Sequence, residues 1–192
     1  MVDFLLYLQY NCIYAKLELK IYSKEHQPMN SIMALKEGKV DLAVVSASCN
    51  ISSPLKMRRV LGYQDILIGG TKYQELKGKR ISLEKLSEYP WISLTSESIT
   101  RNFLNEYFEE HGLQFSPHVE LATTDMILPV VRHNLGIGFI PAELVKADLL
   151  AGTVFEIKVE ETMPERDIIL IYDTEYPQSI ASKEFQKFLA ER

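Results

Sequence analysis

Residues 35–45 read LKEGKVDLAVV, and this stretch decides the fold class. Apolar residues at helical spacing begin before this stretch and continue to Leu35. Gly38 follows them, and glycine commonly ends helices. Residues 41–45 then form a short, nearly continuous apolar run, which is typical of a strand covered on both faces in a parallel sheet. The stretch therefore predicts a helix followed by a buried strand.

The alternation of strand and helix patterns continues through the rest of the chain. Strand patterns occupy residues 17–21, 91–94, 119–121, 136–140 and 168–172. Helix patterns follow Ser98, Thr123 or Thr124, and a last one contains Phe185. Pro129 falls about one turn inside the helix after Thr124, where it should kink the axis. Alternating strands and helices predict an α/β fold with mixed, mainly parallel sheets and helices on both faces.

Two stretches without strong periodicity, around Gly69-Gly70 and around residues 163–167, are candidate crossings between two lobes. If the chain crosses at both, residues 1–67 and 167–192 form a discontinuous first lobe. Residues 68–166 then form an inserted second lobe. Each lobe has the size of a domain with its own core.

Composition narrows the class of function. A net charge of −5 leaves no basic surplus for phosphates, so we expect no nucleic-acid ligand for this chain itself. Cys12 and Cys49 lack the spacing of a metal site or a disulfide framework, which favours a reducing cytoplasm. We find no signal-peptide pattern and no apolar run of membrane-spanning length. We therefore expect a cytoplasmic protein without a membrane partner, a metal or a cofactor.

The sequence motifs of the common enzyme classes do not occur. The sequence has no G-x-S-x-G, no H-E-x-x-H, no P-loop and no dinucleotide-binding glycine motif. Gly136 and Gly138 precede Phe-Ile-Pro rather than a third glycine, which indicates close backbone packing at a strand. No nucleophile or acid–base pair stands out. We therefore expect no catalytic residue and no enzyme activity.

Small hydroxyl residues recur just after three of the expected strands. These positions are Ser46 and Ser48 with Ala47 between them, Ser96, Ser98 and Thr100, and Thr123. In open α/β sheets, ligands bind outside the carboxyl ends of strands, where helix N-termini present free N–H groups. Such a site suits a small anion, especially a carboxylate. Taken singly, each hydroxyl is better explained as an ordinary helix cap, and only their convergence favours binding.

Arg101 lies in the first turn of the helix that follows Ser98. It could clamp a carboxylate through two parallel hydrogen bonds. It could equally be a solvated residue that pairs with Asn105 or Glu106 on its own helix.

Blocks along nearly the whole chain resemble the effector-binding domain of LysR-type transcriptional regulators. They are Leu35-x-x-Gly38-x-Val-Asp41-Leu-Ala-Val-Val45, Trp91-Ile-Ser-Leu94 followed by Ser98-x-x-Arg101-x-x-Leu104, Val131-x-x-x-Leu135-Gly-Ile-Gly-Phe-Ile-Pro141, and Phe185-Gln-Lys-Phe-Leu189. The resemblance implies a two-lobed fold like that of type 2 periplasmic binding proteins, with the effector in the cleft between the lobes. Effector contacts would then fall at Ser46 to Ser48, at Ser96 to Thr100 with Ile99 included, and at Thr123.

The resemblance also implies partners. In the family, a DNA-binding helix-turn-helix and a dimerising helix precede this domain, and neither pattern is found here. DNA would be contacted only through that module, and a homodimer or homotetramer would relay effector binding to it. Tyr14-Ala-Lys-Leu-Glu-Leu19 resembles the family's second strand, so the first strand of lobe 1 is expected to be missing. A solute-binding protein and a two-lobed enzyme remain alternatives on the same fold.

Overall fold

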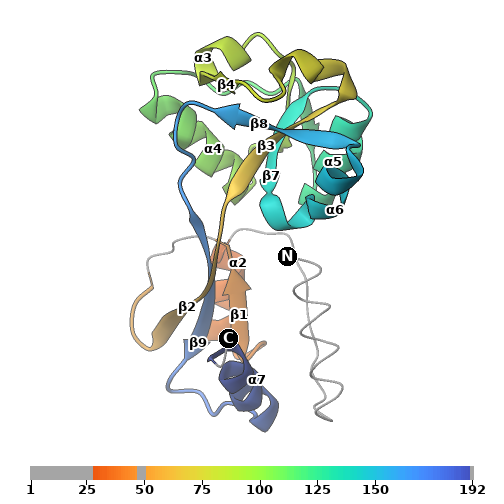
Figure 1. The fold of residues 1–192 in the computed structure, drawn as a ribbon. Coiled ribbons are helices and arrows are strands. Elements are labelled where there is room, and N and C mark those ends of the chain that lie inside the picture. The colour runs from red at the N-terminus through yellow and green to blue at the C-terminus, as the bar shows by residue number, and fades with distance from the viewer. Residues whose placement is uncertain (1–27, 47–50, 191–192) are drawn as a thin grey trace. The chain divides into compact units, whose positions relative to one another are not determined.

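The computed structural model describes residues 28–46 and 51–190, and these form parts of two compact units. Unit 1 combines residues 1–61 with residues 168–192, and unit 2 consists of residues 62–167. The chain therefore passes between the units twice (Figure 1). We call residues 61–62 the first crossing and residues 167–168 the second crossing.

The first crossing precedes the position that the sequence led us to expect, near Gly69-Gly70. Gly69 and Gly70 instead end strand β3 (Asp65–Gly70), and both are buried in unit 2. They lie there because β3 pairs with β7 on one side and with β8 on the other. A Cβ atom on Gly70 would collide with the carbonyl oxygen of Val131, so close packing explains the glycine at this position.

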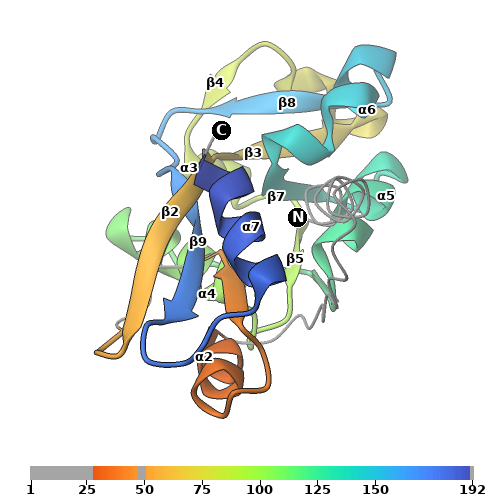
Figure 2. The same ribbon diagram turned by 90° about the horizontal axis from the view of Figure 1, so that it is seen from below.

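Unit 1 contains, among the described residues, a three-stranded sheet in the order β1-β9-β2, of which β9 and β2 are labelled side by side in Figure 2. Its strands are β1 (Leu42–Val45), β2 (Leu55–Tyr63) and the central β9 (Arg166–Asp173). β1 and β9 are antiparallel, with Leu42 opposite Tyr172 and Val45 opposite Ile169. The sheet is accompanied by helices α2 (Pro28–Lys36) and α7 (Ile180–Ala190). The expected helix and strand of residues 29–45 are thus confirmed, but β1 pairs with β9 in antiparallel fashion and not in the expected parallel sheet.

Helices cover both faces of the unit 1 sheet because successive strand residues point to opposite sides. Ala43 and Val45 of β1 pack into one cluster with Ile32 and Leu35 of α2. The alternate residues of β1 pack instead against a cluster built around Leu170. Phe185 and Leu189 of α7 and Leu170 of β9 form that second cluster.

Unit 2 contains a six-stranded sheet in the order β4-β8-β3-β7-β5-β6. The strands not yet given are β4 (Arg80–Ile81), β5 (Trp91–Leu94), β6 (Val119–Leu121), β7 (Ile137–Pro141) and β8 (Val154–Val159). β5 runs parallel to β6 and to β7, whereas β3 runs antiparallel to β7 and to β8. The sheet therefore mixes parallel and antiparallel pairs.

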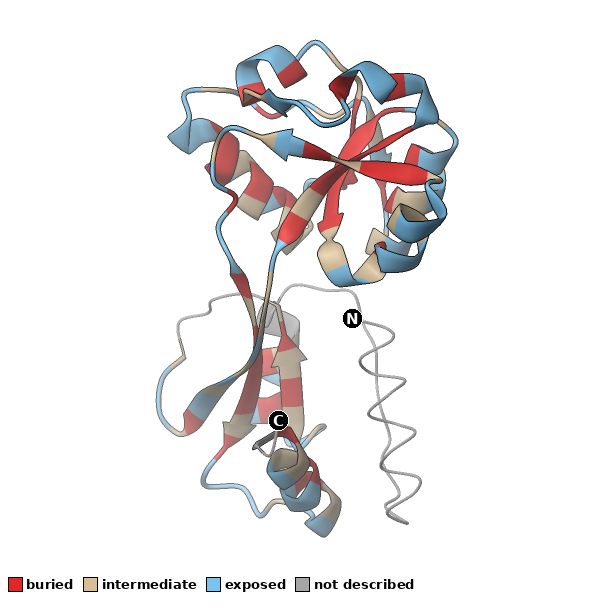
Figure 3. Cartoon of the chain, viewed as in Figure 1, coloured by how far each residue is buried: buried red, intermediate tan, exposed pale blue. Residues whose placement is uncertain are grey.

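Helical elements flank the unit 2 sheet, and the strands of this sheet are the most buried part of unit 2 (Figure 3). They are η1 (Thr71–Leu76), α3 (Leu83–Leu86), α4 (Ile99–Glu110), η2 (Thr124–Met126), α5 (Ile127–Arg132), η3 (Ala142–Leu144) and α6 (Lys146–Ala151). Residues of η1, α3 and α4 pack into one core cluster, and residues of α5 and α6 pack into another. α4 ends at Glu110 with His111 as its C-cap, and Gly112 follows with a φ of 73°, the left-handed conformation that glycine adopts readily.

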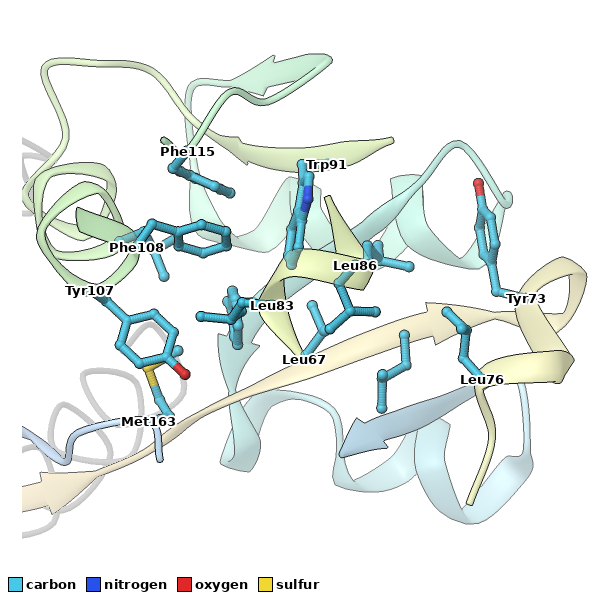
Figure 4. Close-up of a cluster of buried hydrophobic side chains, with 14 of the residues drawn as sticks. Leu67, Tyr73, Leu76, Leu83, Leu86, Trp91, Tyr107, Phe108, Phe115 and Met163 are labelled. Atoms are coloured by element: carbon cyan, nitrogen blue, oxygen red, sulfur yellow. The ribbon is translucent and has the colours of Figure 1, made fainter. Parts of the chain in front are cut away.

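The larger core cluster of unit 2 is aromatic (Figure 4). The Trp91 ring stacks on Phe139 at a centroid distance of 5.7 Å. It meets Phe108 and Phe115 edge-on, at 5.4 and 5.5 Å. Offset stacking and edge-on contacts are the arrangements that aromatic rings prefer. This cluster therefore fixes α4 on the sheet at a defined position.

The helix expected after Thr124 differs from the prediction. Residues 124–126 form the 3₁₀ segment η2, and α5 begins only at Ile127. Pro129 consequently lies in the first turn of α5, where a backbone N–H has no partner within the helix. The expected kink is therefore unnecessary.

Candidate functional site

The carboxyl ends of β5 and β6 lie side by side at one edge of the unit 2 sheet. The two strands are parallel, with Leu94 opposite Leu121. The backbone N–H of Thr95 donates to the carbonyl oxygen of Leu121 at 3.0 Å, which holds the segments beyond both strands together. The polar residues that follow β5 and β6 therefore begin at the same edge of the sheet.

The segment after β5 leads directly into α4. Ser98 has the extended backbone of a helix N-cap, and its carbonyl oxygen accepts from Asn102 N at 3.0 Å. Its hydroxyl, however, makes no cap hydrogen bond. Thr123 precedes η2 in the same way and also makes no cap bond with its side chain. The ordinary-cap explanation therefore does not hold for these two hydroxyls.

The structure places the expected site residues in two groups. Ser96, Ser98, Ile99, Thr100 and Thr123 belong to unit 2 and lie just beyond β5 or β6. Ser96 is exposed, and the other four are half-buried.

The other group, the expected contacts at Ser46 to Ser48, belongs to unit 1. Ser46 directly follows β1 and is half-buried. Ala47, Ser48 and Cys49 lie outside the described residues, as does the strand pattern of residues 14–21.

A buried ion pair lies at the same edge of the unit 2 sheet. β3 is antiparallel to β7, so its first residue, Asp65, lies opposite Pro141 at the carboxyl end of β7. The Arg166 Nη1 donates to Asp65 Oδ2 at 2.7 Å, and both side chains are buried. Arg166 Nη2 also donates to Thr100 Oγ1 at 3.1 Å. One of the expected site residues is thus hydrogen bonded to a charged group that sequence reasoning missed.

The surroundings of this ion pair are apolar and aromatic. The Arg166 guanidinium lies 4.7 Å from the Phe103 ring centroid and 5.2 Å from that of Tyr63, within cation–π range. Burial raises the pKa of Asp65, and the positive charge of Arg166 opposes that rise. Asp65 Oδ1 is buried and accepts no hydrogen bond from the described residues. Among the described residues, the Asp65 carboxylate is therefore held through Oδ2 alone, by Arg166.

Arg101 holds α4 in place instead of presenting a free guanidinium. Its Nη1 donates to Glu120 Oε1 at 2.7 Å and to the Leu94 carbonyl oxygen at 3.2 Å. Its Nε donates to Asn105 Oδ1 at 3.0 Å. The expected pairing with Asn105 is confirmed, but Arg101 is buried rather than solvated, and its acidic partner is Glu120 rather than Glu106. These contacts fasten the first turn of α4 to both strands of the edge, so the carboxylate-clamp interpretation of Arg101 is not supported.

The chemistry available at this edge is that of binding. The first N–H groups of α4 have no acceptor within the helix and carry its partial positive charge. Residues with hydroxyl groups follow both β5 and β6 at this edge. In the part of the chain that the structure describes, no three His, Cys, Asp or Glu side chains are grouped to hold a metal ion. None of the described helices combines the length and apolar character that crossing a membrane requires.

Comparison with known sequences identifies one family. A family model described as the LysR substrate binding domain matches residues 15–192. The HTH-type transcriptional activator CmpR of Synechocystis is 26% identical over 135 residues, which are 70% of this chain and 44% of that protein. A probable RuBisCO transcriptional regulator of Chlorokybus atmophyticus is 24% identical over 163 residues, covering 80% of this chain and 50% of the relative. The chain thus spans about half the length of the curated relatives it matches.

Solved structures share the fold. The regulatory domain of CcmR from Synechocystis, in complex with 2-PG, matches with a TM-score of 0.84 at 16% identity, covering 98% of this chain and 90% of that one. The effector binding domain of QuiR, in complex with shikimate, matches with a TM-score of 0.69 at 21% identity, covering 84% and 76%. The expected α/β fold, similar to type 2 periplasmic binding proteins, is confirmed.

Proposed function

The chain belongs to the LysR substrate binding domain family, and from this we propose that it is the effector-sensing domain of a transcriptional regulator. In this proposal, a small anion binds at the N-terminus of α4. One observation carries it: the carboxyl ends of β5 and β6 bring Ser98 and Thr123 to one edge, and neither hydroxyl caps its own helix.

The proposed ligand is a small carboxylate or a similar anion. The free N–H groups of Ile99 and Thr100 would bind its negative charge, as helix N-termini do elsewhere. The hydroxyls of Ser96, Ser98 and Thr123 would donate further hydrogen bonds. The 2-PG and shikimate named for the CcmR and QuiR structures support a small molecule as the ligand class. A contribution from Ser46, Ala47 and Ser48 stays a prediction.

The proposed role ends in DNA binding by another part of a longer protein. Effector binding would shift the population of conformations, which requires the effector to prefer one of them. A homodimer or homotetramer in the cytoplasm would pass that shift to a helix-turn-helix module. The relatives are transcriptional regulators and not enzymes, which supports binding without catalysis.

A thermal-shift screen with a matched pair of variants tests the proposal. The panel consists of metabolite carboxylates, and it includes shikimate and 2-PG. We expect at least one compound to raise the melting temperature of the wild-type chain in a dose-dependent way, because a ligand of the native state stabilises it by mass action.

In the variant Ser98→Leu, we expect affinity for that compound to fall roughly tenfold or more, the loss that one hydrogen bond to a charged group represents. Ser116→Leu is the control, because Ser116 is an exposed serine in the loop before the amino end of β6. Equal affinity in Ser98→Leu and wild type would remove the N-terminus of α4 from the site. A folded wild-type chain that responds to no compound would contradict the sensor proposal.

A further inference from the structure

We propose that Arg166 is a positioning residue that couples the first turn of α4 to both crossings. The inference rests on the proposed function, since the first turn of α4 is the proposed effector site. Arg166 precedes the second crossing, and its partner Asp65 follows the first crossing. Its other partner, Thr100, lies in the first turn of α4.

The Arg166 guanidinium contacts two segments and thereby joins them to a third, its own, and the two contacted segments present their side chains through regular geometry. Thr100 and Phe103 are three residues apart on α4, so they lie on the same helix face toward Arg166. Tyr63 and Asp65 are two residues apart in extended chain and therefore point to the same side. Arg166 itself supplies the third segment. A shift of the first turn of α4 would therefore displace a group that both crossings share.

Burial gives this arrangement its rigidity. The Arg166 side chain is 6% exposed and that of Asp65 is 1% exposed. Little water reaches either partner, and a displacement of Arg166 large enough to break the pair would leave Asp65 with an unpaired buried charge. The cost of separating the pair makes the three segments move together.

A second contact joins the segment after the first crossing to the segment before the second crossing. This contact does not involve α4, so a variant that removes it serves as the control. Gln64 Nε2 donates to the Met163 carbonyl oxygen at 2.9 Å. Removing this bond loosens the two segments without changing any contact of α4.

Hydrogen exchange of the ligand-free 192-residue chain, measured by mass spectrometry, tests the coupling. Thr100→Val removes the hydroxyl that Arg166 binds and keeps the Asp65–Arg166 pair and the side-chain shape. We expect exchange to rise about tenfold, the value of one hydrogen bond to a charged group, both in residues 99–102 and in residues 62–66 and 164–168. Gln64→Leu should speed exchange in the two crossing segments alone. Residues 137–140 in the centre of the sheet should keep their protection in both variants.

Faster exchange confined to residues 99–102 in Thr100→Val would overturn the proposal, because the crossings would then be insensitive to α4. A second arm adds inorganic phosphate as a minimal anion. In the wild type it should slow exchange in residues 99–102 and in both crossing segments, whereas in Thr100→Val any slowing should stay at residues 99–102. Slowing of the crossing segments in Thr100→Val as well would also contradict coupling through Arg166. No effect of phosphate on the wild type would count against the proposed anion site, while the ligand-free comparison would still decide the coupling.

Discussion

Gly136 shows how one residue without a side chain fixes two strands of unit 2. The N–H of the next residue, Ile137, donates to the Pro90 carbonyl oxygen at 2.9 Å, which brings the β7 backbone against the start of β5. A Cβ atom on Gly136 would collide with that same oxygen. The interpretation of this glycine as a close-packing residue is therefore confirmed.

We expect Gly136→Ala to lower the free energy of unfolding by about 2 to 3 kcal/mol, the usual cost of forcing an extra carbon into a packed site. Gly112→Ala is the comparison, because nothing lies within 4 Å of a Cβ atom there and only the positive φ is strained. That variant should lose about 1 kcal/mol. Urea denaturation followed by the fluorescence of Trp91 measures both, and equal losses would mean that packing at Gly136 is loose.

At the residue scale, local patterns predict only part of the candidate site. The hydroxyls beyond β5 and β6 could be found because each follows an apolar strand run. The Asp65–Arg166 pair could not, since its partners are 101 residues apart and meet only through the pairing of β3 with β7 and the return of the chain at the second crossing. The only available signal was a lone acidic residue opening the apolar run of β3.

At the scale of elements, α5 is informative because its sequence contains a proline. Pro129 lies in the first turn, and its carbonyl oxygen accepts from His133 N at 3.1 Å. We expect Pro129→Ala to change the free energy of unfolding by less than about 1 kcal/mol, mainly through a more flexible unfolded chain. Val130→Pro, one position later, should cost about 3 kcal/mol, because it clashes with the preceding turn and removes a helical hydrogen bond. Chemical denaturation of the two variants side by side measures this contrast, and similar losses would place the start of α5 elsewhere.

The elements that were predicted and those that were missed differ in their local periodicity. Apolar runs mark β1, β5, β7 and β9, and β6 shows a short apolar–polar alternation around Glu120. Both α4 and α7 have one apolar face, so each of these elements could be read from the sequence. β2 escaped because exposed residues such as Lys56, Met57 and Arg59 interrupt its pattern. In β3, two glycines were interpreted as a hinge, although neighbouring strands crowd Gly69 and the end of α5 with Asn134 crowds Gly70. α3, with four residues, is too short to show a helical period.

At the scale of the whole molecule, the two units have separate hydrophobic clusters, which makes their stabilities separable by spectroscopy. Trp91 is the only tryptophan of the sequence and lies in unit 2, whereas circular dichroism reports helices of both units. We expect Phe185→Ala to destabilise unit 1 by about 3 to 5 kcal/mol, because it removes a buried aromatic ring from the cluster with Leu170 and Leu189 and leaves a cavity. The dichroism transition should then begin at lower urea while the fluorescence midpoint stays in place.

Phe108→Ala is the matched variant in unit 2, and it should move the fluorescence midpoint directly, since Phe108 contacts Trp91. A shift of the fluorescence midpoint in Phe185→Ala equal to the shift of the dichroism transition would show that both units unfold in one cooperative step.

The position of β9 in the unit 1 sheet has a consequence for synthesis on the ribosome. β9 lies between β1 and β2, yet all but its first two residues are translated only after unit 2 has been made. The nascent chain can therefore complete the unit 2 sheet while β1 and β2 still lack the strand that joins them. The edges of β1 and β2 that later receive β9 would remain open to other strands during that interval. A chaperone that shields extended segments would be most useful to this protein between the translation of β2 and the release of β9.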